Sequence, residues 1–194
     1  EGIKTAKELM KIVRNAGVNC FDHAEAYGNP YGEAERIFGI ALKELQEEDS
    51  ELWRRSDLVI TTKIFWGGSG VNESGLSMKH CREGLEASLS RLQIDYVDLL
   101  FCHRPDPHTP TSTVVRAMTQ MVRSGRATAW GTSEWSAQQI TEAFWIAKSE
   151  GLEPPQFEQP QYNMLHRDKF ENEYFPLFNP PYNIGTTIWS PLRS

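Results

Sequence analysis

Six short apolar runs alternate with amphipathic stretches along almost the whole chain, and this alternation limits the possible folds more than any other feature. The apolar runs begin near residues 18, 58, 96, 128, 157 and 185, and we expect the last two strands to span 157–163 and 185–192. The stretches with helical spacing of apolar residues are 5–17, 33–46, 77–93, 111–126, 136–151 and 168–178. Strand-to-strand spacings of about 28 to 40 residues suit units of one strand and one crossover helix. The sequence therefore predicts an α/β fold with a parallel sheet.

Two architectures carry such an alternation, an open doubly wound sheet and a closed (β/α)8 barrel. The open sheet usually has a G-x-G-x-x-G motif after its first strand, and no such motif follows the first run here. A barrel takes about 250 residues, and six units in 194 residues come close to three quarters of one. We therefore expect residues 1–194 to form one partial (β/α)8 TIM barrel domain, with about two strands and both chain ends outside the sequence.

Charge and composition exclude several classes of protein. A net charge of −6 and a pI near 5.4 argue against a nucleic-acid-binding surface and against a polybasic membrane patch. No apolar run approaches 18 residues, so we expect no direct membrane insertion. Cys20, Cys81 and Cys102 are odd in number and widely spaced, which favours reduced thiols and a cytoplasmic protein.

Polar and aromatic residues stand at the ends of the predicted strands. Each of them, taken alone, has an ordinary structural explanation such as a cap, a snorkelling lysine or a buried histidine. In a barrel, however, parallel strands bring all these ends to one rim, where barrel active sites are built. The residues are Asp22, Lys63, His103, Ser133, Gln159, Trp189 and Ser190.

The residue types at these ends suit proton delivery to an oxygen atom. A lysine ammonium near a tyrosine favours the tyrosinate form, and a carboxylate beside the lysine keeps it protonated. Asp22, Tyr27, Lys63 and His103 supply such a set, with a neutral imidazole to orient a carbonyl group. The competing chemistries lack support, because the five histidines show no metal-ligand spacing and neither G-x-S-x-G nor a P-loop occurs.

Several segments resemble the aldo-keto reductase superfamily, and most closely its branch of voltage-gated potassium channel β subunits. The resemblance runs over essentially the whole chain, with the blocks in family order. It is carried by FDHAEAYG, LVITTKIFWGG, GLEASLSRLQIDYVDLLFCHRPDP, VRAMTQMVRSGRATAWGTSEWSA, EQPQYNMLHR and WSPL.

The resemblance implies a barrel that binds NADP(H) without a Rossmann fold. It assigns Tyr27 as general acid, Lys63 as the group that tunes it, and His103 as the group that orients the carbonyl. Asp22 supports the lysine and belongs to the cofactor site. The other implied cofactor contacts are Ser133 and Gln159 to the carboxamide, Trp189 to the nicotinamide face, and Ser190, Pro191, Leu192 and Ser194 to the pyrophosphate.

Two positions depart from the animal channel β subunits, which carry asparagine at the position of His103 and arginine at that of Glu134. His103 completes the tetrad of an active reductase, whereas Glu134 argues against a cofactor contact at its position. His23 and Glu25 are interpreted as loop residues without a chemical role. An apolar pocket formed by residues 65–68 and Trp135 would favour aldehydes, ketones or quinones.

Three functional hypotheses remain open. The first is an NADPH-dependent reductase of small carbonyl compounds. The second is a cytosolic regulatory subunit, in a homotetramer, that binds a potassium channel α subunit and uses its cofactor as a redox sensor. The third is a barrel with different chemistry, such as a lyase.

Overall fold

The computed structural model describes residues 2–193. Its regular elements alternate in the expected order, apart from short helical turns near residue 55 and near residue 170. The elements are α1 (Gly2–Asn15), β1 (Cys20–Asp22), α2 (Glu33–Glu48), η1 (Arg55–Asp57), β2 (Val59–Ile64), α3 (Met78–Leu92), β3 (Val97–Cys102), α4 (Thr111–Arg123), β4 (Ala127–Ser133), α5 (Ala137–Glu150), β5 (Phe157–Gln159), η2 (Lys169–Glu173), η3 (Phe175–Phe178) and β6 (Gly185–Thr186).

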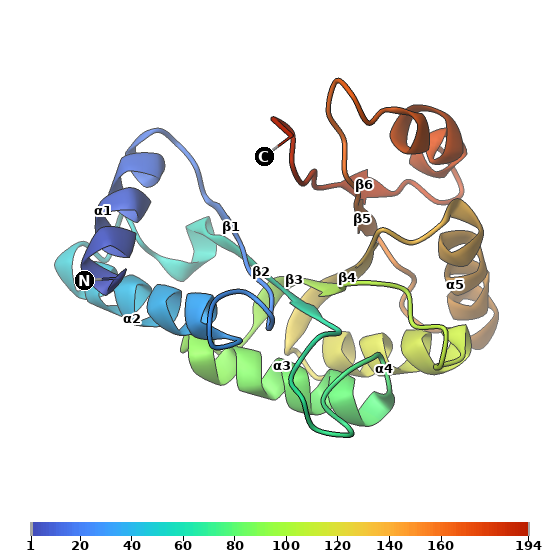
Figure 1. Cartoon of the computed structure of the whole chain (residues 1–194), viewed down its shortest axis with the longest axis horizontal. Helices are drawn as coiled ribbons and strands as arrows, with labels where there is room; N and C mark the ends of the chain where they lie inside the picture. Colours follow the sequence, from blue (N-terminus) through green and yellow to red (C-terminus); the bar gives the residue numbers. More distant parts are fainter. Residues whose placement is uncertain (1, 194) are drawn as a thin grey trace.

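The sheet contains six parallel strands in chain order, from β1 to β6. Figure 1 shows the strands as a curved arc, with α1 to α5 along its outer side and the C-terminal segment near its open end. Within residues 2–193, β1 and β6 are the outermost strands and do not pair with each other. The molecule is therefore an incomplete (β/α)8 barrel, and the predicted fold class is confirmed.

One hydrogen bond between side chains shows how strongly the sheet curves. Asp22 ends β1 and Gln159 ends β5, so four strand-to-strand steps separate them in the sheet. A flat sheet with strands about 4.8 Å apart would hold them on the order of 19 Å from each other. Instead, Gln159 Nε2 donates to Asp22 Oδ1 at 3.2 Å. The interior of the arc is therefore narrow, as it is in a closed barrel.

Helix ends follow the local sequence signals at α3 and α5. The side chain of Ser77 caps α3 by accepting from the backbone N–H of His80. Ser136 and Gln139 form a capping box at α5, and Gly151 ends that helix in the left-handed conformation that a residue without a Cβ adopts most readily. α4 begins at Thr111, and its N-cap is Pro110, which has no side-chain group to cap the helix.

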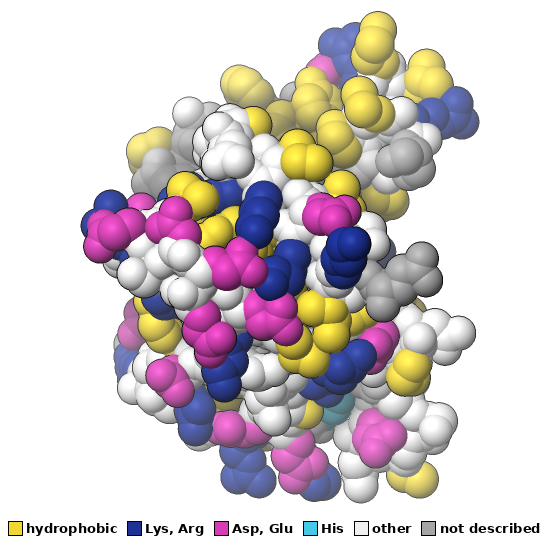
Figure 2. Space-filling model, turned by 90° about the vertical axis from the view of Figure 1, so that its left-hand side faces the viewer, with side chains coloured by type: hydrophobic (Ala, Val, Ile, Leu, Met, Phe, Trp, Pro, Cys, Tyr) yellow, Lys and Arg dark blue, Asp and Glu magenta, His cyan; other side chains and the backbone are white. Residues whose placement is uncertain are grey.

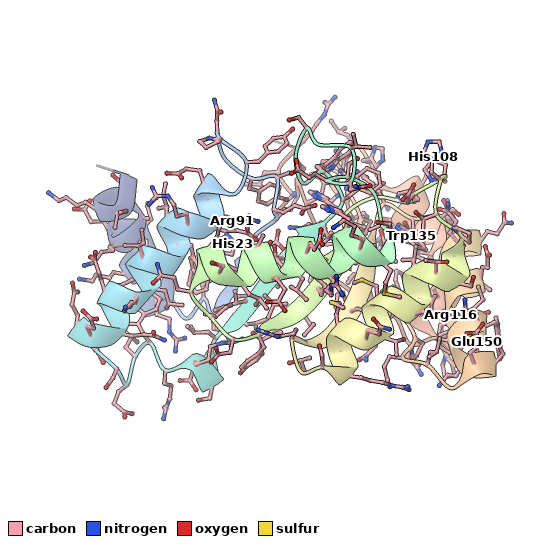
Figure 3. The ribbon with its side chains drawn as sticks, turned by 90° about the horizontal axis from the view of Figure 1, so that it is seen from below. His23, Arg91, His108, Arg116, Trp135 and Glu150 are labelled. Carbon is pink, nitrogen blue, oxygen red and sulfur yellow. The ribbon has the colours of Figure 1, made fainter. Side chains whose placement is uncertain are left out.

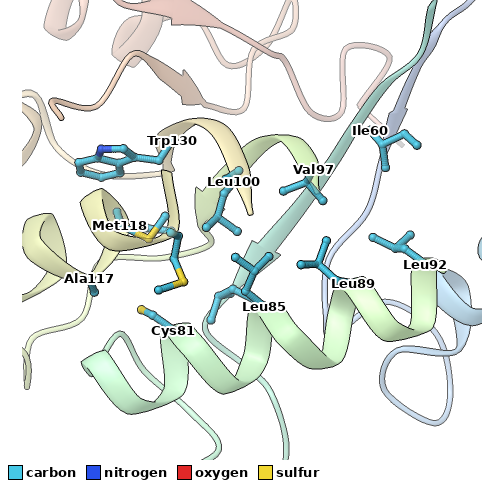
Figure 4. Close-up of a cluster of buried hydrophobic side chains, with 14 of the residues drawn as sticks. Ile60, Cys81, Leu85, Leu89, Leu92, Val97, Leu100, Ala117, Met118 and Trp130 are labelled. Atoms are coloured by element: carbon cyan, nitrogen blue, oxygen red, sulfur yellow. The ribbon is translucent and has the colours of Figure 1, made fainter. Parts of the chain in front are cut away.

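The core lies between the sheet and the outer helices. Leu85, Leu89 and Leu92 form the predicted stripe on α3 and are buried. Figure 4 shows this stripe facing Val97 and Leu100 of β3 in one continuous cluster. Burial of a leucine side chain contributes about 1.5–3 kcal/mol, so this layer fixes the strands whose ends carry the polar residues.

The last two strands are shorter than predicted. The expected strand over 157–163 forms a ladder only in β5, because Pro160 has no N–H to donate. The expected strand over 185–192 is reduced to β6 and an isolated bridge between Gln161 and Trp189. The expected helix over 168–178 is replaced by η2 and η3, and Pro176 lies in the first turn of η3.

The predicted apolar face of α1 is covered only in part. Met10 is buried, but Leu9 is 57% exposed, because α1 lies at the end of the arc and packs mainly on α2. Figure 2 shows mixed acidic and basic side chains over the side of the molecule that carries the N-terminal helices. Lys7 and Lys11 contribute to this pattern with ion pairs to Glu48. None of the helices within residues 2–193 is long and apolar enough to span a membrane.

Candidate active site

Asp22 and Lys63 form an ion pair where β1 and β2 end. The two strands pair in register, with Asp22 opposite Thr61, so the lysine lies two residues further toward the rim. The Lys63 side chain is 0% exposed, and its Nζ donates to Asp22 Oδ2 at 2.5 Å and to the His23 carbonyl at 2.7 Å. The desolvation of this ammonium is thus compensated by a carboxylate and a carbonyl.

The Asp22 carboxylate is held by further donors. Its Oδ1 accepts from Thr61 Oγ1 at 2.6 Å and from Gln159 Nε2 at 3.2 Å. Burial by itself would raise the pKa of Asp22, but the charge and hydrogen bond of Lys63 outweigh burial and lower it. Asp22 is therefore ionised at neutral pH, as a support for the lysine requires.

Tyr27 lies beside the same lysine, in the loop after β1. Lys63 Nζ is 4.7 Å from the centroid of the Tyr27 ring, a cation–π distance. The Tyr27 ring is 38% exposed and meets the His103 ring edge-on, with 5.9 Å between centroids. The loop thus places a phenol between a buried cation and the open interior of the rim.

His103 follows β3 and is neutral. Burial, together with the positive charges of Lys63 and Arg104, lowers the pKa of His103 to about 3. Its Nδ1 is buried, with no hydrogen-bond partner in the described part of the chain. A neutral imidazole can donate one hydrogen bond to an acceptor such as a carbonyl oxygen. The structure thus brings Asp22, Tyr27, Lys63 and His103 together, and we call this group the lysine side of the rim.

Ser133, Gln159 and Trp189 form a second group, the tryptophan side of the rim. Ser133 Oγ donates to the Gln159 carbonyl at 2.8 Å, which joins the ends of β4 and β5. Gln159 Nε2 donates to Thr187 Oγ1 as well as to Asp22. Since both amide hydrogens are used, the Gln159 side-chain oxygen is the atom left for an outside donor.

Trp189 follows β6, and its half-buried indole donates from Nε1 to Glu134 Oε1 at 2.9 Å. The next residues form a turn, in which Ser190 has a positive φ of 48° and its carbonyl accepts from Asn163. Pro191 borders a cavity of about 470 Å³ beside Tyr162 and Asn163, and Leu192 is exposed. Ser194 lies outside the described residues.

Two carboxylates that the motif analysis set aside are central to the geometry. Glu25 is 3% exposed, and its Oε1 accepts from the backbone N–H groups of Phe65 and Gly67 and contacts His80 Nε2 at 3.2 Å. Glu25 does lie in a loop, as expected, but its buried carboxylate joins that loop to the one after β2. Glu134 was expected to matter only as a departure from arginine, yet it contacts Trp189. Neither role leaves a local signal, since the partners are distant in sequence.

Three further expectations concern His23, Trp135 and the thiols. The His23 ring packs on Phe38 with 4.3 Å between centroids, and burial lowers its pKa to about 4, so it is a packing residue within the loop. Trp135 is 3% exposed and belongs to the core, which corrects its assignment to a pocket lining. Trp66 remains exposed. The three cysteines are free, with Cys81 and Cys102 buried and Cys20 exposed.

Comparisons with known proteins agree with this geometry. The model of the aldo/keto reductase family matches residues 4–194. The chain belongs to the aldo/keto reductase family. Among residues 2–193, no cluster of His, Cys, Asp or Glu suited to a metal ion is found.

The most similar relatives that we compared are named as potassium channel subunits. The chain is 53% identical to a probable voltage-gated potassium channel subunit beta of Oryza sativa subsp. japonica and 54% identical to one of Arabidopsis thaliana, each over 192 residues. These alignments cover 99% of this chain and 56% of either relative. A putative channel subunit beta of Schizosaccharomyces pombe is 47% identical over 194 residues, which cover 99% of this chain and 54% of that protein. The chain thus spans about half the length of these relatives.

Proposed function

We propose that this aldo/keto reductase chain supplies most of the active site of an NADP-dependent oxidoreductase that reduces small aldehydes or ketones to alcohols. The observation that supports it best is the buried Lys63–Asp22 pair beside the Tyr27 ring, with a neutral His103 against the same ring. We further propose that residues 1–194 belong to one partial barrel domain of a cytosolic protein.

The tryptophan side has the donors and surfaces that a nicotinamide needs. The Gln159 side-chain oxygen can accept from a carboxamide, and the Trp189 indole offers a flat apolar face. Arg104 Nη1 donates to Ser133 Oγ at 3.3 Å and holds this hydroxyl beside Gln159. Ser190, Pro191 and Leu192 would lie along the pyrophosphate. The bound cofactor would supply the hydride, and the preference for NADP(H) rests on the family resemblance.

The lysine side has the groups that proton delivery needs. In our proposal His103 donates to the carbonyl oxygen of the substrate and orients it, while Tyr27 gives its hydroxyl proton to that oxygen. The tyrosinate left behind is stabilised by the Lys63 ammonium, which Asp22 keeps protonated and fixed in position. All charges needed for this step are present before substrate binds, which lowers reorganisation during the reaction.

The test is Tyr27→Phe in the full-length protein. We expect the variant to lose roughly a hundredfold or more in NADPH oxidation with an aromatic aldehyde. Quenching of tryptophan fluorescence by NADPH should be retained, and NADH should be run in parallel. Tyr31→Phe is the matched control, because Tyr31 is an exposed tyrosine in the same loop. A Tyr27→Phe variant that oxidises NADPH as fast as the parent would show that Tyr27 is not the proton donor.

A second function is favoured by the names of the relatives. Since relatives at 53% and 54% identity are named as probable potassium channel β subunits, we propose that the full-length protein also binds a potassium channel α subunit as a homotetramer. Co-purification with the cytosolic domain of a plant or fungal voltage-gated potassium channel, followed by mass determination, tests this. A monomer that such domains do not retain would contradict it.

A further inference from the structure

Glu134 stands at the point where β4 ends, in a backbone conformation that glutamate rarely adopts. Its φ of 58° lies in the left-handed region, which costs a residue with a Cβ on the order of 1–2 kcal/mol. Such a conformation persists only where the surroundings hold the residue in place. The contacts of its side chain show what holds it.

The Glu134 carboxylate accepts hydrogen bonds from three separate segments. Oε1 accepts from the Trp189 indole N–H at 2.9 Å and from the Gln161 backbone N–H at 2.7 Å. Oε2 accepts from Lys169 Nζ at 2.8 Å. One side chain therefore joins the end of β4 to the segments after β5 and β6 and to η2.

This arrangement keeps Glu134 ionised and fixes the indole. Burial alone would raise the pKa of Glu134, but the hydrogen bond from Lys169 and the two N–H donors outweigh burial and lower it. A charged acceptor makes a stronger hydrogen bond with the indole than a neutral one does. Because an indole N–H donates in the plane of its ring, the bond restricts the ring orientation and itself occupies neither ring face.

We propose that Glu134 is a positioning residue that holds the Trp189 indole as the surface on which the nicotinamide stacks. This inference rests on the proposed function, because it assigns a purpose to Trp189 within the cofactor site. It also gives Glu134 a role that does not require contact with the cofactor. Lys169 belongs to the same arrangement, because its ammonium group balances the negative charge of the Glu134 carboxylate, which the neutral indole cannot do.

The first measurement needs no cofactor. In the full-length protein, the indole ¹H–¹⁵N resonance of Trp189 is assigned by its loss in Trp189→Phe. We expect Glu134→Ala to move this resonance toward the position of solvent-exposed indoles, and Glu134→Gln to move it less. The control is Glu150→Ala, because Glu150 pairs with Arg116 on the outer layer of helices, where Figure 3 places both residues. It should leave the resonance unchanged.

The second measurement is NADPH affinity, read from quenching of tryptophan fluorescence. We expect Glu134→Ala to weaken binding about tenfold, as loss of one hydrogen bond to a charged group predicts. The KM for NADPH should rise more than kcat falls, since binding is affected before chemistry. Glu134→Gln guards against a folding defect, because it preserves the volume of the side chain.

The outcomes separate the two proposals. A parent that binds NADPH, with Glu134→Ala unchanged in both affinity and indole resonance, overturns the role of Glu134 and leaves the proposed function standing. A parent that binds neither NADPH nor NADH overturns the proposed function and this inference with it. Weakened binding together with a shifted resonance supports both.

Discussion

The two sides of the rim are assembled by different means. The lysine side rests on neighbouring strands in register, where β1 pairs with β2 and β2 pairs with β3 through four residue pairs. The tryptophan side rests on β5 and β6, which contain only three and two residues, and on hydrogen bonds between side chains and loops. The sheet therefore fixes Asp22 and Lys63, whereas the Glu134 carboxylate holds the Trp189 indole.

This difference determines how readily each side of the rim can move. Moving Lys63 would require breaking the ladder between buried strands or leaving a buried ammonium without its carboxylate, which costs about 3–5 kcal/mol. Turning the half-buried Trp189 indole away from its place requires breaking its side-chain hydrogen bond to Glu134. We infer that the tryptophan side adjusts more readily, which suits a surface that must admit and release a large ligand.

The largest effect is expected from Lys63→Met, which removes the ammonium group at the centre of the lysine side. Carbonyl reduction should fall roughly a thousandfold, because the tyrosinate would lose its neighbouring cation. NADPH affinity should change much less, since Gln159 and Trp189 keep their partners. Steady-state kinetics and fluorescence quenching measure the two quantities. Lys79→Met is the control, because Lys79 forms only an exposed ion pair with Glu83. Equal losses in affinity and rate would contradict the separation of the two sides.

A smaller effect is expected from Glu25→Gln, which tests the support of the loop after β2. The variant would leave His80 and two backbone N–H groups facing an amide that is also a donor. We expect the free energy of unfolding to fall by about 1–3 kcal/mol, measured by urea denaturation. The Trp189 indole resonance should stay in place, because the Glu25 carboxylate contacts Phe65, Gly67 and His80 rather than Trp189. Glu83→Gln, at an exposed position, provides the comparison, and a matching loss there would argue against the role of Glu25.

The smallest effect concerns Glu158, which lies behind the tryptophan side. Burial raises the pKa of Glu158 to about 7, although a hydrogen bond from Thr132 opposes the rise. Because the unfolded carboxyl loses its proton near pH 4.5 and the folded one near pH 7, this group favours the folded state most below pH 4.5. Its contribution is lost as pH rises through 7. The low pKa values of His23 and His103 act in the opposite sense. Their contribution to the stability of the folded state is lost as the pH falls below 6.5.

Glu158→Gln should therefore remove the part of the decline in Tm that occurs between pH 5 and pH 8. The protonated carboxyl has a partner in Tyr174, whose hydroxyl lies 3.2 Å from Oε1 and itself donates to the Trp135 carbonyl. Thermal melts at the two pH values measure the effect, with exposed Glu142→Gln as the control. If Glu158→Gln and the parent show the same pH dependence, the carboxyl does not titrate in this range.

The sequence predicted the structure best where local patterns and tertiary packing agree. The β-branched run of β2 and the leucine stripe of α3 have one stable placement each, and the serine and glycine signals mark both ends of α5. The order of strand ends then placed Asp22, Lys63 and His103 at one rim. These expectations hold because each depends on residues close together in the chain or on the geometry of parallel strands.

The contacts that the sequence did not reveal join distant residues. Glu134 and Trp189 are 55 positions apart, and Glu25 and His80 are separated by the same distance, so no local spacing reveals either pair. The partial exposure of α1 follows from its place at the end of the arc, which its amphipathic pattern does not encode. Pro160 did give a local signal for the short β5, since a proline interrupts a ladder.

The position of Cys20 makes the edge of the sheet open to chemical labelling. Thiol reagents attack the thiolate, and burial raises the pKa of Cys81 to about 12 and raises the pKa of Cys102 well above its usual value. Alkylation should therefore begin at exposed Cys20, the first residue of β1. The rate of Cys20 alkylation therefore reports how accessible the β1 edge is. Any strand or partner chain that covers β1 in the full-length protein will slow the modification of Cys20, two residues from Asp22.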